Sequence, residues 1–395
     1  MPGLEAPPGQ EGVDEVLERL FRYGTTSLDR LSFRQALDEV GAQEWATTDF
    51  AVRVLHDHFA SAVALLADHV IHPRLPEQDF RTVRAQLVAE LPGRLESPEY
   101  LAKRSLEAAL LPAVDAALRQ PTPSTVESLG LDDVRAYHRR VFRPGLTTIV
   151  VIGRIAPEEA RAVIERSFGA WTAGGPKPET DLPPVPPSGP APTRGSRCDP
   201  RPGRRAAGRD DRRHPLEPRL LCARSRKSRP RRAFYATRLY RDLRERRGLV
   251  YHVGSSLQMT KTRGMIELEY ACDPGNVARA RAIIERDLRE MRRTPVRPEE
   301  LVQARRLLLS NIPLGESSEE DIARGLLTRS AEDLPLDEPL RAAETLPPAR
   351  CRRRRGGLPS LGATGKPRGG GARAAPVSLA ISRSIGRGID LRPSQ

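Results

Sequence analysis

Apolar residues near the start of the chain recur at helical spacing. From Val13 to Phe21 they fall on one face of a helix, and Gly24 is expected to end it. A run of β-branched residues between Leu146 and Gly153 predicts a strand closed by glycine. Further helices are predicted over residues 28–40, 52–71, 80–91 and 157–168, the third of them ending before Pro92 and the last opened by Pro157.

A second ordered pattern covers the later part of the chain. Strands are predicted over 249–257 and 265–271, on either side of a polar turn. Helices and strands mixed in both ordered parts predict an α+β fold. Helices are predicted over residues 235–247, 276–291 and 299–311.

The stretches between and after these parts have a different composition. Residues 176–192 are rich in proline and predict a linker. The predicted organisation is a disordered N-terminus (1–10), a first domain (11–175), a linker or frame-shifted segment (176–233), a partial second domain (234–349) and a disordered basic tail (350–395).

The basic charge is confined to two of these stretches. The formal net charge is +14, of which residues 190–233 carry +11 and residues 350–395 carry +10, leaving −7 for the rest. Both stretches are rich in Arg, Pro, Gly and Ala, and their apolar residues follow neither the helix nor the strand periodicity. One interpretation is a disordered basic linker and tail. The other is frame-shifted translation of a GC-rich gene, which we favour because an ordered pattern resumes abruptly at Phe234.

Several classes of protein are not indicated by the sequence. No apolar run approaches the roughly 20 residues of a membrane helix, and the first residues lack the pattern of a secretory signal. The four cysteines have no C-x-x-C spacing, so neither a zinc cluster nor a disulfide framework is predicted.

Several short motifs together resemble the insulinase/pitrilysin-type zinc peptidases, a family of inverzincins. Gly24-Thr25 follows an amphipathic helix, as it does after the H-x-x-E-H helix of that family. The segment 237–251, Thr-Arg-Leu-Tyr-Arg-Asp-Leu-Arg-Glu-Arg-Arg-Gly-Leu-Val-Tyr, is similar to the helix and strand of the family's second domain. The other matches are residues 132–138, 142–144, 149–153 and 168–171, which resemble the end of its first domain.

The resemblance implies two related metallohydrolase-like domains of the mitochondrial-processing-peptidase type. It also implies zinc-dependent peptide cleavage, and many bacterial members work as pairs in which one subunit holds zinc and the other contacts substrate. The second domain is expected to be incomplete, because the Arg-rich stretches stand where further parts of its sheet belong. A bacterial cell-envelope or periplasmic location is expected from the same resemblance.

The metal-binding motif of the family is degenerate here. Counting back from Gly24 places the two histidine positions at Glu15 and Arg19 and the general base at Glu18. Two neutral imidazoles would be needed to hold Zn²⁺ and activate its water, whereas an arginine has no lone pair to give. The third ligand position matches Glu90. We therefore expect no catalytic residue and no metal in this chain, and an ion pair between Glu15 and Arg19 within the helix.

Two residues of the second domain match the family's substrate contacts. Arg244 and Tyr251 stand seven positions apart, across a helix end and the following strand. Arginine can donate forked hydrogen bonds to a peptide carbonyl or carboxylate, and a tyrosine hydroxyl can stabilise an oxyanion. The alternative is a basic helix end followed by a tyrosine at the edge of the core.

Three functional hypotheses follow from these observations. The first is a non-catalytic, substrate-binding subunit, with a zinc-bearing peptidase and a peptide as partners. The second is an active zinc peptidase that uses Glu15 or the pair His69 and His72 as ligands. The third is a nucleic-acid-binding protein acting through the Arg-rich stretches, whose lack of interleaved aromatics argues against specific recognition.

Overall fold

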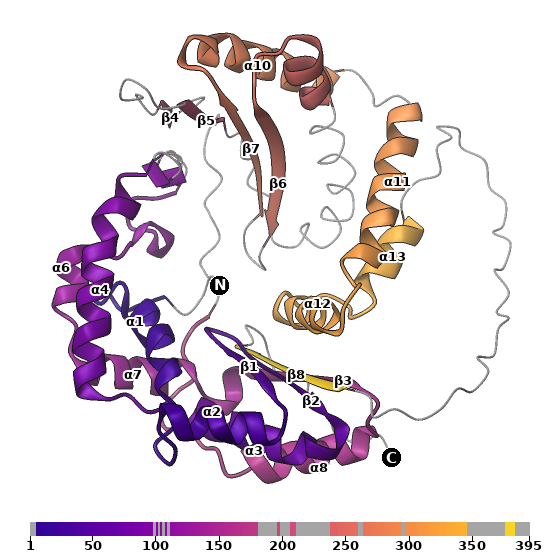
Figure 1. Cartoon of the computed structure of the whole chain (residues 1–395). Coiled ribbons are helices and arrows are strands. Elements are labelled where there is room, and N and C mark those ends of the chain that lie inside the picture. Colours follow the sequence, from indigo (N-terminus) through magenta and orange to yellow (C-terminus); the bar gives the residue numbers. More distant parts are fainter. Residues whose placement is uncertain are drawn as a thin grey trace, which may run out of the picture.

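The computed structural model describes most of the two ordered parts of the chain. The described residues are 5–97, 100–180 (except 102, 105–106 and 109–110), 196–197, 206–210, 238–259, 264–293, 298–345 and 376–383. The prediction of an α+β fold is confirmed, with helices and two antiparallel sheets (Figure 1).

The first part of the chain is helix-rich. The first helix, α1 (Val13–Leu20), is followed by a short 3-10 segment, η1 (Phe21–Tyr23), and the predicted stop at Gly24 has a φ of 85°. Its elements are α1 (Val13–Leu20), α2 (Arg30–Glu39), β1 (Gln43–Ala46), β2 (Phe50–Leu55), α3 (Phe59–Ile71), α4 (Glu77–Leu95), α6 (Pro123–Glu127), α7 (Leu131–Val141), β3 (Thr147–Gly153) and α8 (Pro157–Phe168).

Two helix predictions in this part are wrong in their bounds. The predicted helix over 52–71 begins only at Phe59, because residues 50–55 bury every second side chain and form β2 instead. The helix predicted to end before Pro92 continues to Leu95. Pro92 gives up one backbone donor there, but Leu87 and Leu91 are buried and hold the helix in place.

The first sheet is completed from the far end of the chain. Its order is β1-β2-β8-β3, with β8 (Pro376–Arg383) antiparallel to both neighbours. Ile381 lies opposite Phe50 on one side and Ile149 on the other. The prediction of a disordered basic tail is therefore wrong for these eight residues, whose Val, Leu and Ile content suits a central strand.

Helices cover both faces of this sheet. Figure 1 shows α3 and α8 on one face and α12 (Glu319–Ala331) on the other. Helix α3 contacts β2, and α12 contacts β3 and β8. A single cluster of buried side chains from Val13 to Phe168 forms the core of this part.

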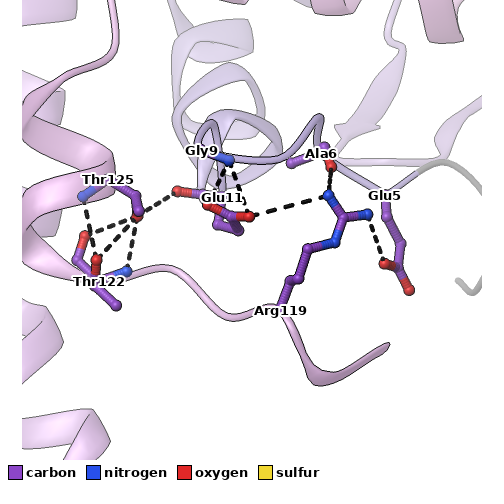
Figure 2. Close-up of polar contacts among 7 residues, drawn as sticks. All are labelled: Glu5, Ala6, Gly9, Glu11, Arg119, Thr122 and Thr125. Carbon is purple, nitrogen blue, oxygen red and sulfur yellow. Dashed lines mark hydrogen bonds and ion pairs between the residues drawn. The ribbon is translucent and has the colours of Figure 1, made fainter. Parts of the chain in front are cut away.

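The residues before α1 are hydrogen-bonded to Arg119 and Thr125, which lie before and within α6. The guanidinium of Arg119 donates to the carbonyl of Ala6 at 2.9 Å and to Glu5 at 3.3 Å, and the hydroxyl of Thr125 donates to the carbonyl of Glu11 at 3.0 Å (Figure 2). The prediction of a disordered N-terminus is wrong for residues 5–10, because the carboxylate of Glu5 and the carbonyl of Ala6 accept hydrogen bonds from Arg119.

The second ordered part contains its own sheet and core. The sheet has the order β4-β5-β7-β6, and five residues of the predicted linker or frame-shifted segment, 206–210, form a strand paired with β7. A small core gathers Leu239, Leu243 and Ile284. The elements are β4 (Ser196–Arg197), β5 (Ala206–Asp210), η5 (Tyr240–Arg246), β6 (His252–Met259), β7 (Gly264–Cys272), α10 (Val277–Arg293), α11 (Pro298–Leu314) and α13 (Glu338–Thr345).

No helix among the described residues is long and apolar enough to cross a membrane.

Candidate functional site

Helix α1 carries the degenerate metal motif and is held tightly by its neighbours. Its apolar face is buried against α4 and α7. This packing sets Glu15 and Arg19, one helical turn apart, opposite the later part of α4, where Glu90 and Arg94 are also one turn apart.

Two forked ion pairs join the two helices at this point. The guanidinium of Arg19 donates to both carboxylate oxygens of Glu90, at 3.0 and 2.6 Å. The guanidinium of Arg94 donates to both oxygens of Glu15, at 2.7 and 2.9 Å. The structure thus brings together Glu15, Arg19 and Glu90, three positions that the sequence assigns to the family's ligands.

These hydrogen bonds fix the charges of the groups. The hydrogen bonds from Arg19 hold the pKa of the Glu90 carboxyl below its usual range, and they raise the pKa of Arg19 in turn. The hydrogen bonds to Glu15 likewise raise the pKa of Arg94. Glu15 also attracts Arg19 through space, but each of the two makes its hydrogen bonds to α4. The predicted ion pair between Glu15 and Arg19 within α1 is therefore present only as this through-space attraction, and the direct contacts of both residues are with α4.

The residues at this position do not fit a zinc ion. Arg19 offers no lone pair and would place a positive charge beside the metal. Both oxygens of Glu15 and both oxygens of Glu90 already accept hydrogen bonds from guanidinium groups. Among the residues that the structure describes, no group of three or more His, Cys, Asp or Glu side chains is arranged to hold a metal.

The alternative ligand pair, His69 and His72, is not brought together as a pair. His69 is buried, with Nδ1 at 2.8 Å from Oε1 of Glu44 and Nε2 at 2.7 Å from the carbonyl oxygen of Phe21. His72 is exposed. Because both ring nitrogens of His69 are used in these hydrogen bonds, neither is available to a metal.

Glu18 lies beside a cavity of about 310 Å³. The cavity is bounded by the end of α1, η1, α2 and β1, and His69 of α3 also lines it. Glu18 therefore faces a space large enough for a side chain or small ligand, next to Arg19.

The two predicted substrate contacts lie at the junction of η5 and β6. Gly248, with a φ of 60°, makes the turn between them. The guanidinium of Arg244 lies 5.9 Å from the ring centre of Tyr240, and the hydroxyl of Tyr251 donates to Asp273 at 2.6 Å. Both side chains are exposed. The hydroxyl of Tyr251 would have to leave Asp273 before it could donate to a substrate.

Comparison with known proteins supports the resemblance. A family model described as the peptidase M16 inactive domain matches residues 128–199 and 233–308. The chain is related to the M16 peptidases. Within the M16 match, residues 200–232 are skipped, and these lie inside the first Arg-rich stretch.

Individual relatives agree with this family. An uncharacterized zinc protease of Mycobacterium leprae is 27% identical over 291 residues, which are 69% of this chain and 62% of the relative. The chain thus spans about three fifths of the length of that relative.

Solved structures show the same fold. An M16 inactive domain from Pseudomonas fluorescens superposes with a TM-score of 0.65 at 18% identity, over 85% of this chain and 81% of that one. Pitrilysin superposes with a TM-score of 0.60 at 18% identity, over 87% of this chain and 38% of that one.

The sequence did not single out Arg94 or Glu44. Arg94 stands four residues after Glu90 on α4, but the sequence predicted that this helix ends before Pro92, and the helical spacing of the two residues was therefore not apparent. Glu44 had no such local signal, because its partner His69 belongs to another element.

Proposed function

We propose that this chain is a non-catalytic M16 subunit that binds peptide substrate for a zinc-bearing partner. The observation that carries the proposal is the pair of forked ion pairs, Arg19 with Glu90 and Arg94 with Glu15. They join α1 and α4 where the family resemblance expects a metal to join them. A charge network that is complete without a metal supports a binding role over a hydrolytic one.

The pairing of inactive and catalytic subunits in this family supports a partner for this chain. Peptide binding through Arg244 and Tyr251 is a part of the same proposal, supported by the exposure of both side chains. A cell-envelope location is a further part, which rests on the resemblance to bacterial family members.

The test is to rebuild the metal motif. Three proteins are purified without chelator: the wild-type chain, the double variant Glu15→His/Arg19→His and the control Glu15→Gln/Arg19→Gln. Mass spectrometry then measures the amount of zinc per chain. The two double variants have the same charge, and in both Glu90 and Arg94 can pair along α4.

We expect about one zinc per chain in the histidine variant, because two imidazoles then join Glu90. The wild-type chain and the glutamine control are expected to hold no stoichiometric zinc and to cleave no peptide. One tightly bound zinc per wild-type chain, or peptide cleavage by it that a chelator abolishes, would overturn the proposal in favour of an active peptidase.

A further inference from the structure

The cavity beside Glu18 has a basic rim. Arg22 on η1 and Arg30 and Arg34 on α2 line it with exposed side chains. Arg30 and Arg34 are one helical turn apart, so their like charges lie on one face of α2 and repel each other. A bound anion would relieve that repulsion.

The guanidinium groups at the rim are open to a ligand. Among the described residues, no hydrogen bond or ion pair engages Arg22 or Arg34. Arg30 lies 6.0 Å from the ring centre of Tyr23, a contact that leaves its N–H groups able to donate. Arg19 differs from these three because Glu90 holds it.

The acids of the same cavity do not balance this charge. The carboxylate of Glu44 is bound to the buried ring of His69 at 2.8 Å. Glu18 is the other acidic residue that lines the cavity. Three arginines at the rim therefore outnumber the one remaining carboxylate, and the cavity carries an excess of positive charge.

Part of the cavity lining is apolar. Phe21, Phe33 and Leu37 line it and are almost fully buried. Phe33 and Leu37 share a face of α2, and each lies three residues after one of the two arginines, Arg30 and Arg34. A ligand that fits must combine an anionic group with an adjoining apolar group, which is the chemistry of a peptide carboxylate beside a bulky side chain.

We propose that this cavity binds a carboxylate of a peptide ligand, with Arg22 and Arg34 as its main hydrogen-bond donors. Guanidinium groups recognise carboxylates by forked hydrogen bonds, and the adjoining apolar side chain contacts Phe33 and Leu37. The proposal rests on the peptide-binding role proposed above and names acidic peptides as the class of ligand. The carboxylate comes from an acidic side chain or from a C-terminus.

The test uses four fluorescent decapeptides and the full-length chain. All contain one phenylalanine, followed by Glu or Gln, and each is made with a free or an amidated C-terminus. Binding is measured by fluorescence anisotropy for the wild-type chain, for Arg22→Gln/Arg34→Gln and for the control Arg139→Gln/Arg161→Gln. The control removes two exposed arginines that do not line the cavity.

We expect an acidic peptide to bind about tenfold more tightly than its neutral counterpart. A preference for Glu over Gln identifies an acidic side chain as the source of the carboxylate. A preference for the free over the amidated C-terminus identifies the C-terminal carboxylate. The cavity variant should lose the preference while keeping its affinity for the neutral peptide, and the control should keep both.

Two results would overturn the inference, and they have different meanings. If all four peptides bind equally and the cavity variant changes nothing, the carboxylate site is wrong and peptide binding stands. If no peptide binds to a chain whose thermal unfolding shows it to be folded, the peptide-binding role itself fails with it.

Discussion

At the scale of single residues, matched charges make the contact between α1 and α4 at the positions that the family resemblance assigns to metal ligands. Removing one member of a forked pair leaves the other without its partner, so the four residues depend on one another. Solvent reaches all four side chains, so salt screens their attraction in part. The network therefore serves more to orient the two helices than to stabilise the chain as a whole.

This network should respond to acid. The folded-state pKa of Glu90 lies below its unfolded value, so the stabilisation is present above the unfolded pKa and is lost as the pH falls through the folded one. We predict that Arg19→Gln lowers the melting temperature at pH 7 and that the difference from wild type becomes smaller as the pH is lowered towards 3. Differential scanning fluorimetry between pH 3 and 7 measures both.

Arg81→Gln is the matched control for this prediction. It breaks an exposed pair with Glu77 that lies within α4 and joins no second helix. Its effect on the melting temperature at pH 7 should be smaller than that of Arg19→Gln. An Arg19 effect that is the same at pH 3 and pH 7 would show that the hydrogen bonds to Glu90 are not its source.

The sequence predicted much of this site. Counting from Gly24 placed Glu15 and Arg19, and the resemblance placed Glu90, which lies 71 residues from Arg19 and touches it. What the count could not supply was the direction of each side chain, since α1 and α4 decide it by packing. Hence Glu15 was paired with Arg19 instead of Arg94.

At the scale of elements, the entry into α1 depends on a glycine. Gly12 has a φ of 99°, and a Cβ there would lie 2.7 Å from Cγ2 of Val126. Gly9 has a φ of 86° but open space around the same position. Substitution of Gly9 therefore measures the cost of the backbone conformation alone, whereas substitution of Gly12 adds the cost of the contact with α6.

We predict that Gly12→Ala destabilises the chain more than Gly9→Ala does. Both substitutions lower the free energy of unfolding by about 1–2 kcal/mol, because alanine disfavours a left-handed backbone. Gly12→Ala lowers it by a further amount of about 1–3 kcal/mol through overpacking against α6. Urea unfolding followed by circular dichroism gives the two free energies. Equal losses would mean that α6 moves aside without cost.

The elements also show where a local pattern misleads. Apolar residues predominate in both β2 and α3, and one helix over residues 52–71 was a natural interpretation. Long-range pairing with β8 decides that residues 50–55 form a strand.

At the scale of the whole molecule, β8 makes the first sheet depend on a distant segment. Ala380 pairs with Ala51 on one side and Val150 on the other. We predict that Ala380→Pro destabilises the first part by about 2 kcal/mol or more, because proline removes a ladder donor from a central strand. Ala380→Ser keeps the N–H and should be nearly neutral.

Hydrogen exchange of β2 and β3 measures this effect. Faster exchange of both strands in Ala380→Pro, with α10 unchanged, is the expected result. Unchanged protection of β2 and β3 would show that the sheet holds together without β8.

The position of β8 also sets an order of events during synthesis. Strands β2 and β3 emerge from the ribosome long before residue 376, and β8 lies between them in the finished sheet. Until then each of them has an unpaired edge, which is a template for pairing with other chains. The first sheet therefore stays incomplete, and prone to association with other chains, until β8 has been synthesised.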